Sequence, residues 1–202
     1  MADWLDGRAD EAIERAANVL ADGDLVVYPT ETVYGLGADA LDPEAVEAVF
    51  SAKRRDREQP ISLAVPSPEA AREYVKPTER ERAFMEQFLP GPVTVVLEKR
   101  PAVPDVLTAG EEKVGVRVPD HPVARALLSA VAPITATSAN VSGRPSVTAP
   151  AALDSEIEAA VAVVLEAGET GGTGSTVLDI ERETIIRSGP LDGAVTDWLG
   201  AH

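Results

Sequence analysis

The sequence predicts an α/β (α+β) fold with an open, twisted, mixed β-sheet flanked by helices. Short apolar segments of strand character alternate along the chain with segments whose apolar residues recur at helical spacing. In two places strands follow one another without a helix between them, which favours a mixed sheet over a purely parallel one. The 202 residues show no repeat, low-complexity tract or linker, so we expect a single domain over 1–202.

Three helix signals stand out in the first half of the chain. Apolar residues at helical spacing predict a helix over 11–21. Asp42 followed by Pro43 is typical of a helix start. Thr78, with Glu81 three residues later, forms a capping box for a further helix. Apolar runs between these helices predict strands at 25–28 and 61–65.

Strands and helices continue to alternate in the second half. β-Branched residues predict a strand over 93–97, and alternation around Gly115 and Arg117 predicts another over 114–118. A helix over 121–130 should lead to the strand that enters 133–146. The remaining expected elements are a helix over 149–160, strands over 161–165 and 175–180, a hairpin to 185–187 and a last helix that includes Trp198.

Composition narrows the possible chemistry. The chain has no cysteine and only two histidines, so it has no disulfide, no thiolate nucleophile and no histidine-rich metal site. Its net charge of −16 disfavours broad electrostatic binding to nucleic acid. An acidic composition poor in lysine is typical of halophilic proteins, so we expect adaptation to high salt. Loss of the folded far-UV CD signal at low salt would support this expectation. No apolar run is long enough to span a membrane, and we expect a cytoplasmic protein.

The segment 133–146, PITATSANVSGRPS, begins as a strand and ends in a loop rich in hydrogen-bond donors. α/β proteins often bind ligands at such a strand end, although the same residue types also form ordinary turns. Arg117 lies among valines in VGVRV, where a guanidinium needs an anionic partner. That partner is either a carboxylate of the protein or, if several cations converge, a bound phosphate or carboxylate.

Two glycine-rich segments resemble nucleotide-binding motifs only in part. GETGGTGS lacks the lysine of a P-loop, and GLGADA lacks the third glycine of a Rossmann fingerprint. We therefore expect both to form tight turns.

Seven segments together resemble the YrdC-like family, the threonylcarbamoyl-AMP synthases. They follow the family order and cover nearly the whole chain: YPTETVYGLGADA (28–40), AKRRDREQPISLAV (52–65), LPGPVTVVL (89–97), VGVRVPDHP (114–122), PITATSANVSGRPS (133–146), GSTVLDI (174–180) and IIRSGP (185–190). The resemblance implies a single YrdC-like domain that condenses L-threonine, bicarbonate (or CO₂) and ATP to threonylcarbamoyl-AMP and pyrophosphate. A tRNA threonylcarbamoyl transferase complex would then use the product for the t6A modification of tRNA.

The resemblance also implies site residues. The family's Lys-x-Arg and Ser-x-Asn signatures fall on four candidate catalytic residues: Lys53, Arg55, Ser138 and Asn140. Positions that hold L-threonine are matched by Thr32, Arg117, Ala136 and Ser175, with Arg117 suited to the carboxylate. Positions that contact ATP are matched by Arg55, Gln59, Lys113, Ser138, Ser146 and Arg187.

The implied reaction requires alignment and positive charge on the phosphates more than covalent help. Lys53 and Arg55 would neutralise developing charge, while Ser138 and Asn140 would donate fixed hydrogen bonds. Mg²⁺ is expected with ATP, held by the nucleotide and water, and no protein residue is predicted as a metal ligand.

Two positions depart from the family pattern. Asp56 stands where a proline usually follows the Lys-x-Arg signature, and Ala64 replaces a common histidine that contacts threonine. Two alternatives remain open: a carbamoyl-adenylate step in hydrogenase maturation, and a non-catalytic RNA-binding module. The acidic charge disfavours the latter, although a weak local contact with tRNA is compatible with it.

Overall fold

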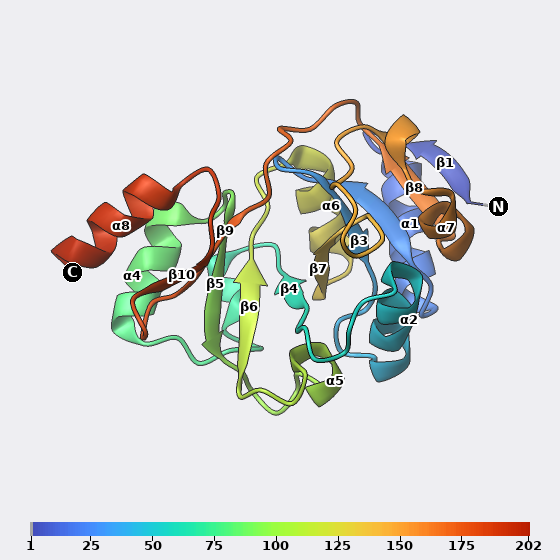
Figure 1. Ribbon diagram of the computed structural model, residues 1–202. Helices are drawn as coiled ribbons and strands as arrows, with labels where there is room; N and C mark the ends of the chain where they lie inside the picture. The colour runs from blue at the N-terminus through green and yellow to red at the C-terminus, as the bar shows by residue number, and fades with distance from the viewer. Residues whose placement is uncertain (1) are drawn as a thin grey trace.

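A ten-stranded mixed sheet forms the body of the computed structural model, which describes residues 2–202 (Figure 1). The strand order is β1-β8-β2-β3-β7-β4-β6-β5-β9-β10. The strands are β1 (Asp3–Asp6), β2 (Val26–Pro29), β3 (Tyr34–Gly37), β4 (Ser62–Ala64), β5 (Val93–Glu98), β6 (Lys113–Arg117), β7 (Ile134–Ser138), β8 (Val163–Glu166), β9 (Thr176–Asp179) and β10 (Thr184–Arg187). Parallel and antiparallel pairs both occur, so the predicted fold class is confirmed.

The helices are α1 (Asp10–Ala21), α2 (Pro43–Lys53), α3 (Pro68–Ala71), α4 (Glu79–Phe88), α5 (Asp105–Thr108), α6 (Pro122–Ala130), α7 (Ser155–Ala160) and α8 (Asp192–Ala201), with a 3₁₀ turn at Pro150–Ala152. Helices α1 and α6 pack on each other and on β2. On the other side of the sheet, α2 contacts α5 and α7. At the far end, the rings of Phe84 on α4 and Trp198 on α8 meet edge to face, which joins these two helices.

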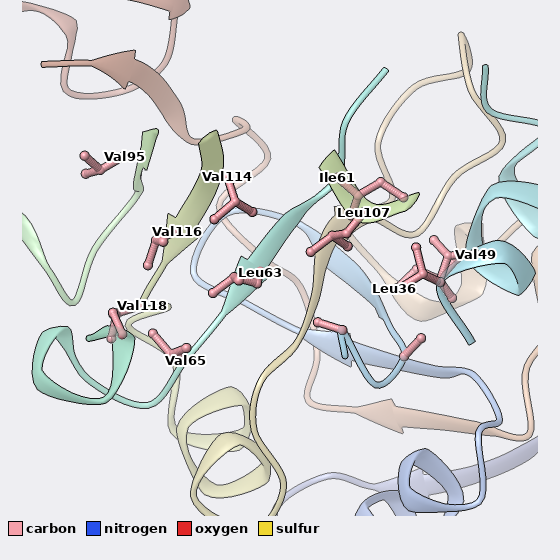
Figure 2. Close-up of a cluster of buried hydrophobic side chains, with 14 of the residues drawn as sticks. Leu36, Val49, Ile61, Leu63, Val65, Val95, Leu107, Val114, Val116 and Val118 are labelled. Atoms are coloured by element: carbon pink, nitrogen blue, oxygen red, sulfur yellow. The ribbon is translucent and has the colours of Figure 1, made fainter. Parts of the chain in front are cut away.

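Strand alternation divides the buried side chains between two cores. Val27 and Val164 belong to the larger core, whereas Val26 and Val163 belong to the smaller core under α1 and α6. Figure 2 shows part of the larger core, where Leu63 of β4 and Val116 of β6 lie close to each other. This larger core extends beneath the sheet along most of its width and gives the opposite face a rigid support.

The predicted helix starts are confirmed. Asp42 Oδ1 accepts a hydrogen bond from the Glu44 amide at 2.9 Å, which caps α2. Thr78 and Glu81 form the capping box of α4, with the Thr78 amide donating to Glu81 Oε2 at 2.7 Å. Both side chains satisfy amides that the first helical turn leaves without partners.

The expectation that GLGADA forms a tight turn was wrong, because Tyr34–Gly37 is strand β3. Its glycines provide space for a neighbouring ring rather than a turn. A Cβ on Gly35 would lie 2.9 Å from Cζ of Tyr28, and one on Gly37 would lie 3.1 Å from Tyr28 Cε1. The Tyr28 ring therefore packs directly on the backbone of β3, and its hydroxyl donates to the Thr135 carbonyl at 3.2 Å.

Three further elements differ from expectation. Strand β1 and helix α5 are too short to give a periodic signal. The single helix expected over 149–160 is a 3₁₀ turn followed by α7, because Leu153 and Asp154 between them have extended backbones. Among the helices of residues 2–202, none has the length and apolar character needed to cross a membrane.

Candidate functional site

A cavity of about 790 Å³ lies on one face of the sheet. Arg117 pairs across strands with Ala64, and Ala64 pairs with Ile134, so all three side chains share a face. Ala64 and Ile134 pack under α1 and α6, whereas Arg117 lies farther along the sheet and lines the cavity. The cavity therefore occupies the part of this face next to the helix pair.

Alternation along the strands selects the residues that face the cavity. On β6 the even-numbered Val114 and Val116 enter the larger core, while Lys113, Gly115 and Arg117 line the cavity. The same alternation on β5 and β9 brings Thr94, Val96, Val177 and Asp179 to it. The VGVRV pattern in the sequence is thus a strand with one apolar face in the larger core and one face that lines the cavity.

Arg117 has an internal carboxylate partner. Its Nη2 donates to Glu31 Oε1 at 2.9 Å and to Thr32 Oγ1 at 2.5 Å. Both charged side chains are largely buried, with 11% and 18% of their surfaces exposed. The buried Arg117 Nε has no acceptor among residues 2–202. The salt bridge considered from the sequence therefore exists, and it engages the guanidinium through Nη2.

A second guanidinium comes from the C-terminal hairpin. Arg187 on β10 donates through Nη2 to the carbonyl and to Oγ of Ser175, both at 2.9 Å. Ser175 Oγ also lies 2.8 Å from Thr94 Oγ1, which fixes this hydroxyl between two strands. Burial, and secondarily the charge of Arg117, lowers the pKa of Arg187. Arg187 and Arg117 therefore act on one another across the cavity.

Arg55 supplies a third guanidinium from the segment after α2. Its Nε donates to the Gln59 carbonyl and its Nη2 to the Pro60 carbonyl, each at 3.0 Å. Burial, followed by the charge of Arg187, lowers the pKa of Arg55. Three arginines from distant parts of the chain thus face one cavity, and a bound anion would relieve their mutual repulsion.

Lys113 at the cavity edge is neutralised within the protein. Its Nζ donates to Asp179 Oδ2 at 2.9 Å and to Glu181 Oε2 at 2.6 Å. Burial acts to lower the pKa of Lys113, but these hydrogen bonds outweigh it and raise the pKa. This end of the cavity therefore carries less free positive charge than the end with the three arginines.

Eight of the twelve predicted site residues line the cavity: Arg55, Lys113, Arg117, Ala136, Ser138, Ser146, Ser175 and Arg187. Thr32 lies behind it on Arg117. Gln59 lies outside it and contributes a backbone carbonyl to Arg55. Lys53 is buried against the loop after β7, Asn140 is a buried residue of that loop, and neither lines the cavity.

Several cavity or supporting residues were not predicted, among them Thr30, Glu31, Thr94 and Asp179. For Thr94 the strand alternation 93–97 was a usable signal, because Thr94 is the polar residue of an otherwise apolar strand. The carboxylate of Glu31 gave no local signal, since its partner Arg117 is 86 residues away. Residues 2–202 contain no group of three or more His, Cys, Asp or Glu side chains arranged to hold a metal ion.

The chain is an α/β protein with an arginine-lined cavity on one face of its sheet. This arrangement is typical of proteins that bind a small anionic molecule. The chain belongs to the Sua5/YciO/YrdC family: the family model, described as "Telomere recombination", matches residues 18–189. The predicted resemblance to the YrdC-like family is therefore confirmed.

Three comparisons are informative. Threonylcarbamoyl-AMP synthase of Pyrococcus abyssi is 39% identical over 89% of this chain and 54% of its own length. The putative threonylcarbamoyl-AMP synthase of Methanocaldococcus jannaschii is 33% identical over 87% of this chain and 84% of its own. The crystal structure of P. abyssi Sua5 complexed with L-threonine is 36% identical, with a TM-score of 0.91 over 99% of this chain and 61% of that one. The chain thus spans about half the length of the first relative.

Proposed function

We propose that this protein is an L-threonylcarbamoyladenylate synthase. The observation that carries the proposal is the convergence of Arg55, Arg117 and Arg187 on one cavity that also holds the Ser138 and Ser175 hydroxyls. Support comes from the P. abyssi Sua5 structure with L-threonine. The fold of that structure matches 99% of this chain, which corresponds to 61% of the Sua5 chain. The substrates would be L-threonine, bicarbonate and ATP.

The threonine carboxylate would bind at Arg117. Arg117 lines the cavity, and its side-chain hydrogen bonds to Thr30, Glu31 and Thr32 are all made through Nη2. A carboxylate accepting from the guanidinium N–H groups that face the cavity would make a strong, directional contact. Glu31, which accepts from Nη2, would hold the guanidinium in the orientation that faces the cavity.

The triphosphate would lie between Arg55 and Arg187, whose pKa values are both lowered by burial and by a neighbouring arginine. Threonine's amine would add to bicarbonate with loss of water, giving a carbamate. One carbamate oxygen would then attack the α-phosphorus, the bond from that phosphorus to the bridging oxygen would break, and pyrophosphate would leave. Arg55, Arg187 and Ser138 would stabilise the charge on the phosphate oxygens.

Magnesium would enter with the nucleotide. The described residues do not fit a protein cage for it, because the acidic groups at the cavity edge, Asp179 and Glu181, are already paired with Lys113. Triphosphate oxygens and water would therefore hold the ion. The product is a reactive mixed anhydride, which a tRNA threonylcarbamoyl transferase complex would consume in t6A formation.

Pyrophosphate release measured at high salt tests this proposal. We expect release that requires ATP, bicarbonate and L-threonine together, and a product with the mass of threonylcarbamoyl-AMP. L-Valine, which matches threonine in shape but lacks the hydroxyl, is the control substrate. Absence of threonine-dependent release from protein shown by CD to be folded would overturn the proposal.

A further inference from the structure

Lys53 occupies an unusual position for a residue of a phosphate-binding signature. It is the last residue of α2 and only 1% exposed. Its Nζ donates to the Ser138 carbonyl and, at 2.7 Å, to the Asn140 carbonyl. Both acceptors are backbone carbonyls, and Lys53 is not among the residues that line the cavity. The ammonium therefore contacts the backbone of this loop and does not form part of the cavity wall.

Asn140 holds the same loop from within. Its Nδ2 donates to the Val141 carbonyl at 2.9 Å and to the Arg144 carbonyl at 2.8 Å. The Ser142 amide donates back to the Lys53 carbonyl at 2.8 Å. The side chains of Lys53 and Asn140 thus bind four carbonyls of residues 138–144, which we call the 138–144 loop.

The charged groups around Lys53 are consistent with a role in holding the loop backbone. In the described part of the chain no carboxylate lies within ion-pair distance of its Nζ. Burial, and then the charge of Arg55, lowers the pKa of Lys53 to about 8. A buried ammonium without a counterion is costly, and here carbonyl dipoles alone offset the cost.

We propose that Lys53 is a positioning residue, which holds the 138–144 loop so that Ser138 and Ser146 face the ligand cavity. Arg55 and Ser138, the signature residues that line the cavity, would contact the phosphates. Lys53 and Asn140 would act through the loop backbone. This differs from the role that family resemblance implies for Lys53, namely neutralising phosphate charge directly. The consequence for activity rests on the proposed function, whereas the loop geometry does not.

Amide hydrogen exchange in the ligand-free protein tests the inference without any substrate. In Lys53→Met we expect peptides covering the 138–144 loop to exchange about tenfold faster, because two backbone carbonyls lose their donor. Arg55→Met is the matched control: it removes a cation of the same signature, and loop exchange should stay at the wild-type rate. Loop exchange in Lys53→Met within twofold of wild type would overturn the proposal, whatever the protein's catalytic activity.

Lys53→Gln guards against loss of folding and separates geometry from charge. Gln is uncharged but keeps a donor, with a reach shorter by one bond. Positioning predicts that Gln recovers part of the loop protection and part of the ATP affinity lost in Lys53→Met. Equal ATP affinity in the Gln and Met variants, both below wild type, would instead indicate direct charge neutralisation and overturn the proposal. Exchange in α1 and α6, which pack on each other and on β2, reports whether each variant is folded.

Discussion

Arg117 on β6 and Glu31 after β2 form a largely buried ion pair at the base of the cavity, with Nη2 and Oε1 2.9 Å apart. Glu31 Oε2 also accepts from the Asp120 amide at 3.2 Å, so the carboxylate is held on both oxygens. The pair joins residues that are 86 positions apart in the chain. Its position would make the stability of the fold and the proposed binding of the threonine carboxylate depend on the same guanidinium.

Replacing Arg117 by Ala should weaken threonine binding far more than ATP binding. A carboxylate that loses a guanidinium partner loses about 2–3 kcal/mol, or roughly a hundredfold in affinity. Isothermal titration of the variant with each ligand separately measures both effects. Equal losses for threonine and ATP would refute the assignment of Arg117 to the amino acid.

Replacing Glu31 by Gln should destabilise the ligand-free protein by about 2 kcal/mol, because a mostly buried guanidinium loses its counterion. L-Threonine should then raise the midpoint of thermal unfolding more in this variant than in wild type, since its carboxylate supplies the missing charge. Glu47→Gln, at an exposed ion pair with Arg57, is the control and should change stability little. An equal threonine shift in wild type and Glu31→Gln would contradict this account.

Stability should rise with pH between about 8 and 10, and Lys53 should cause the rise. Its pKa is about 8 in the folded protein, against an ordinary value of 10.5. In this window the unfolded chain still binds the proton that the folded protein has lost, so raising the pH favours the folded state. We expect a gain of about 2 kcal/mol in urea denaturation of wild type relative to Lys53→Met. Parallel pH profiles of the two proteins would count against it.

Replacing Gly35 by Ala should destabilise the protein by about 1–3 kcal/mol, because the added Cβ would meet the Tyr28 ring at 2.9 Å. Gly193→Ala in α8 is the control, since nothing lies within 4 Å of a Cβ there. Alanine in that helix should be neutral or stabilising by up to about 1 kcal/mol. Urea denaturation measures both, and a Gly35→Ala variant as stable as Gly193→Ala would refute the packing argument.

Local sequence signals predicted the elements whose causes are local. The caps at Asp42 and Thr78 and the alternation around Arg117 each depend on residues a few positions apart, and all three appear in the structure. Strand β3 was missed because the reason for its glycines lies in Tyr28 on the neighbouring strand. A turn and a close approach of a ring both require glycine, and the segment alone does not distinguish them.

The sequence predicted which residues belong to the candidate site better than it predicted where their side chains lie. Family resemblance selected residues from six segments, most of which line the cavity. It did not separate Arg55, which faces the cavity, from Lys53 two residues earlier, which contacts the loop backbone. The difference arises at Arg54, whose left-handed backbone, φ 49°, ends α2 and reverses the direction of the chain between them.

The order of the strands has a consequence for how the protein is made. Chain segment 167–175 leaves β8 near one edge of the sheet and delivers β9 and β10 to the opposite edge. Ser175 and Arg187 therefore reach the cavity only after the segment that contains β9 and β10 has left the ribosome. A nascent chain without these residues lacks part of the cavity wall and part of the larger core, so its early folding must proceed without help from bound ligand.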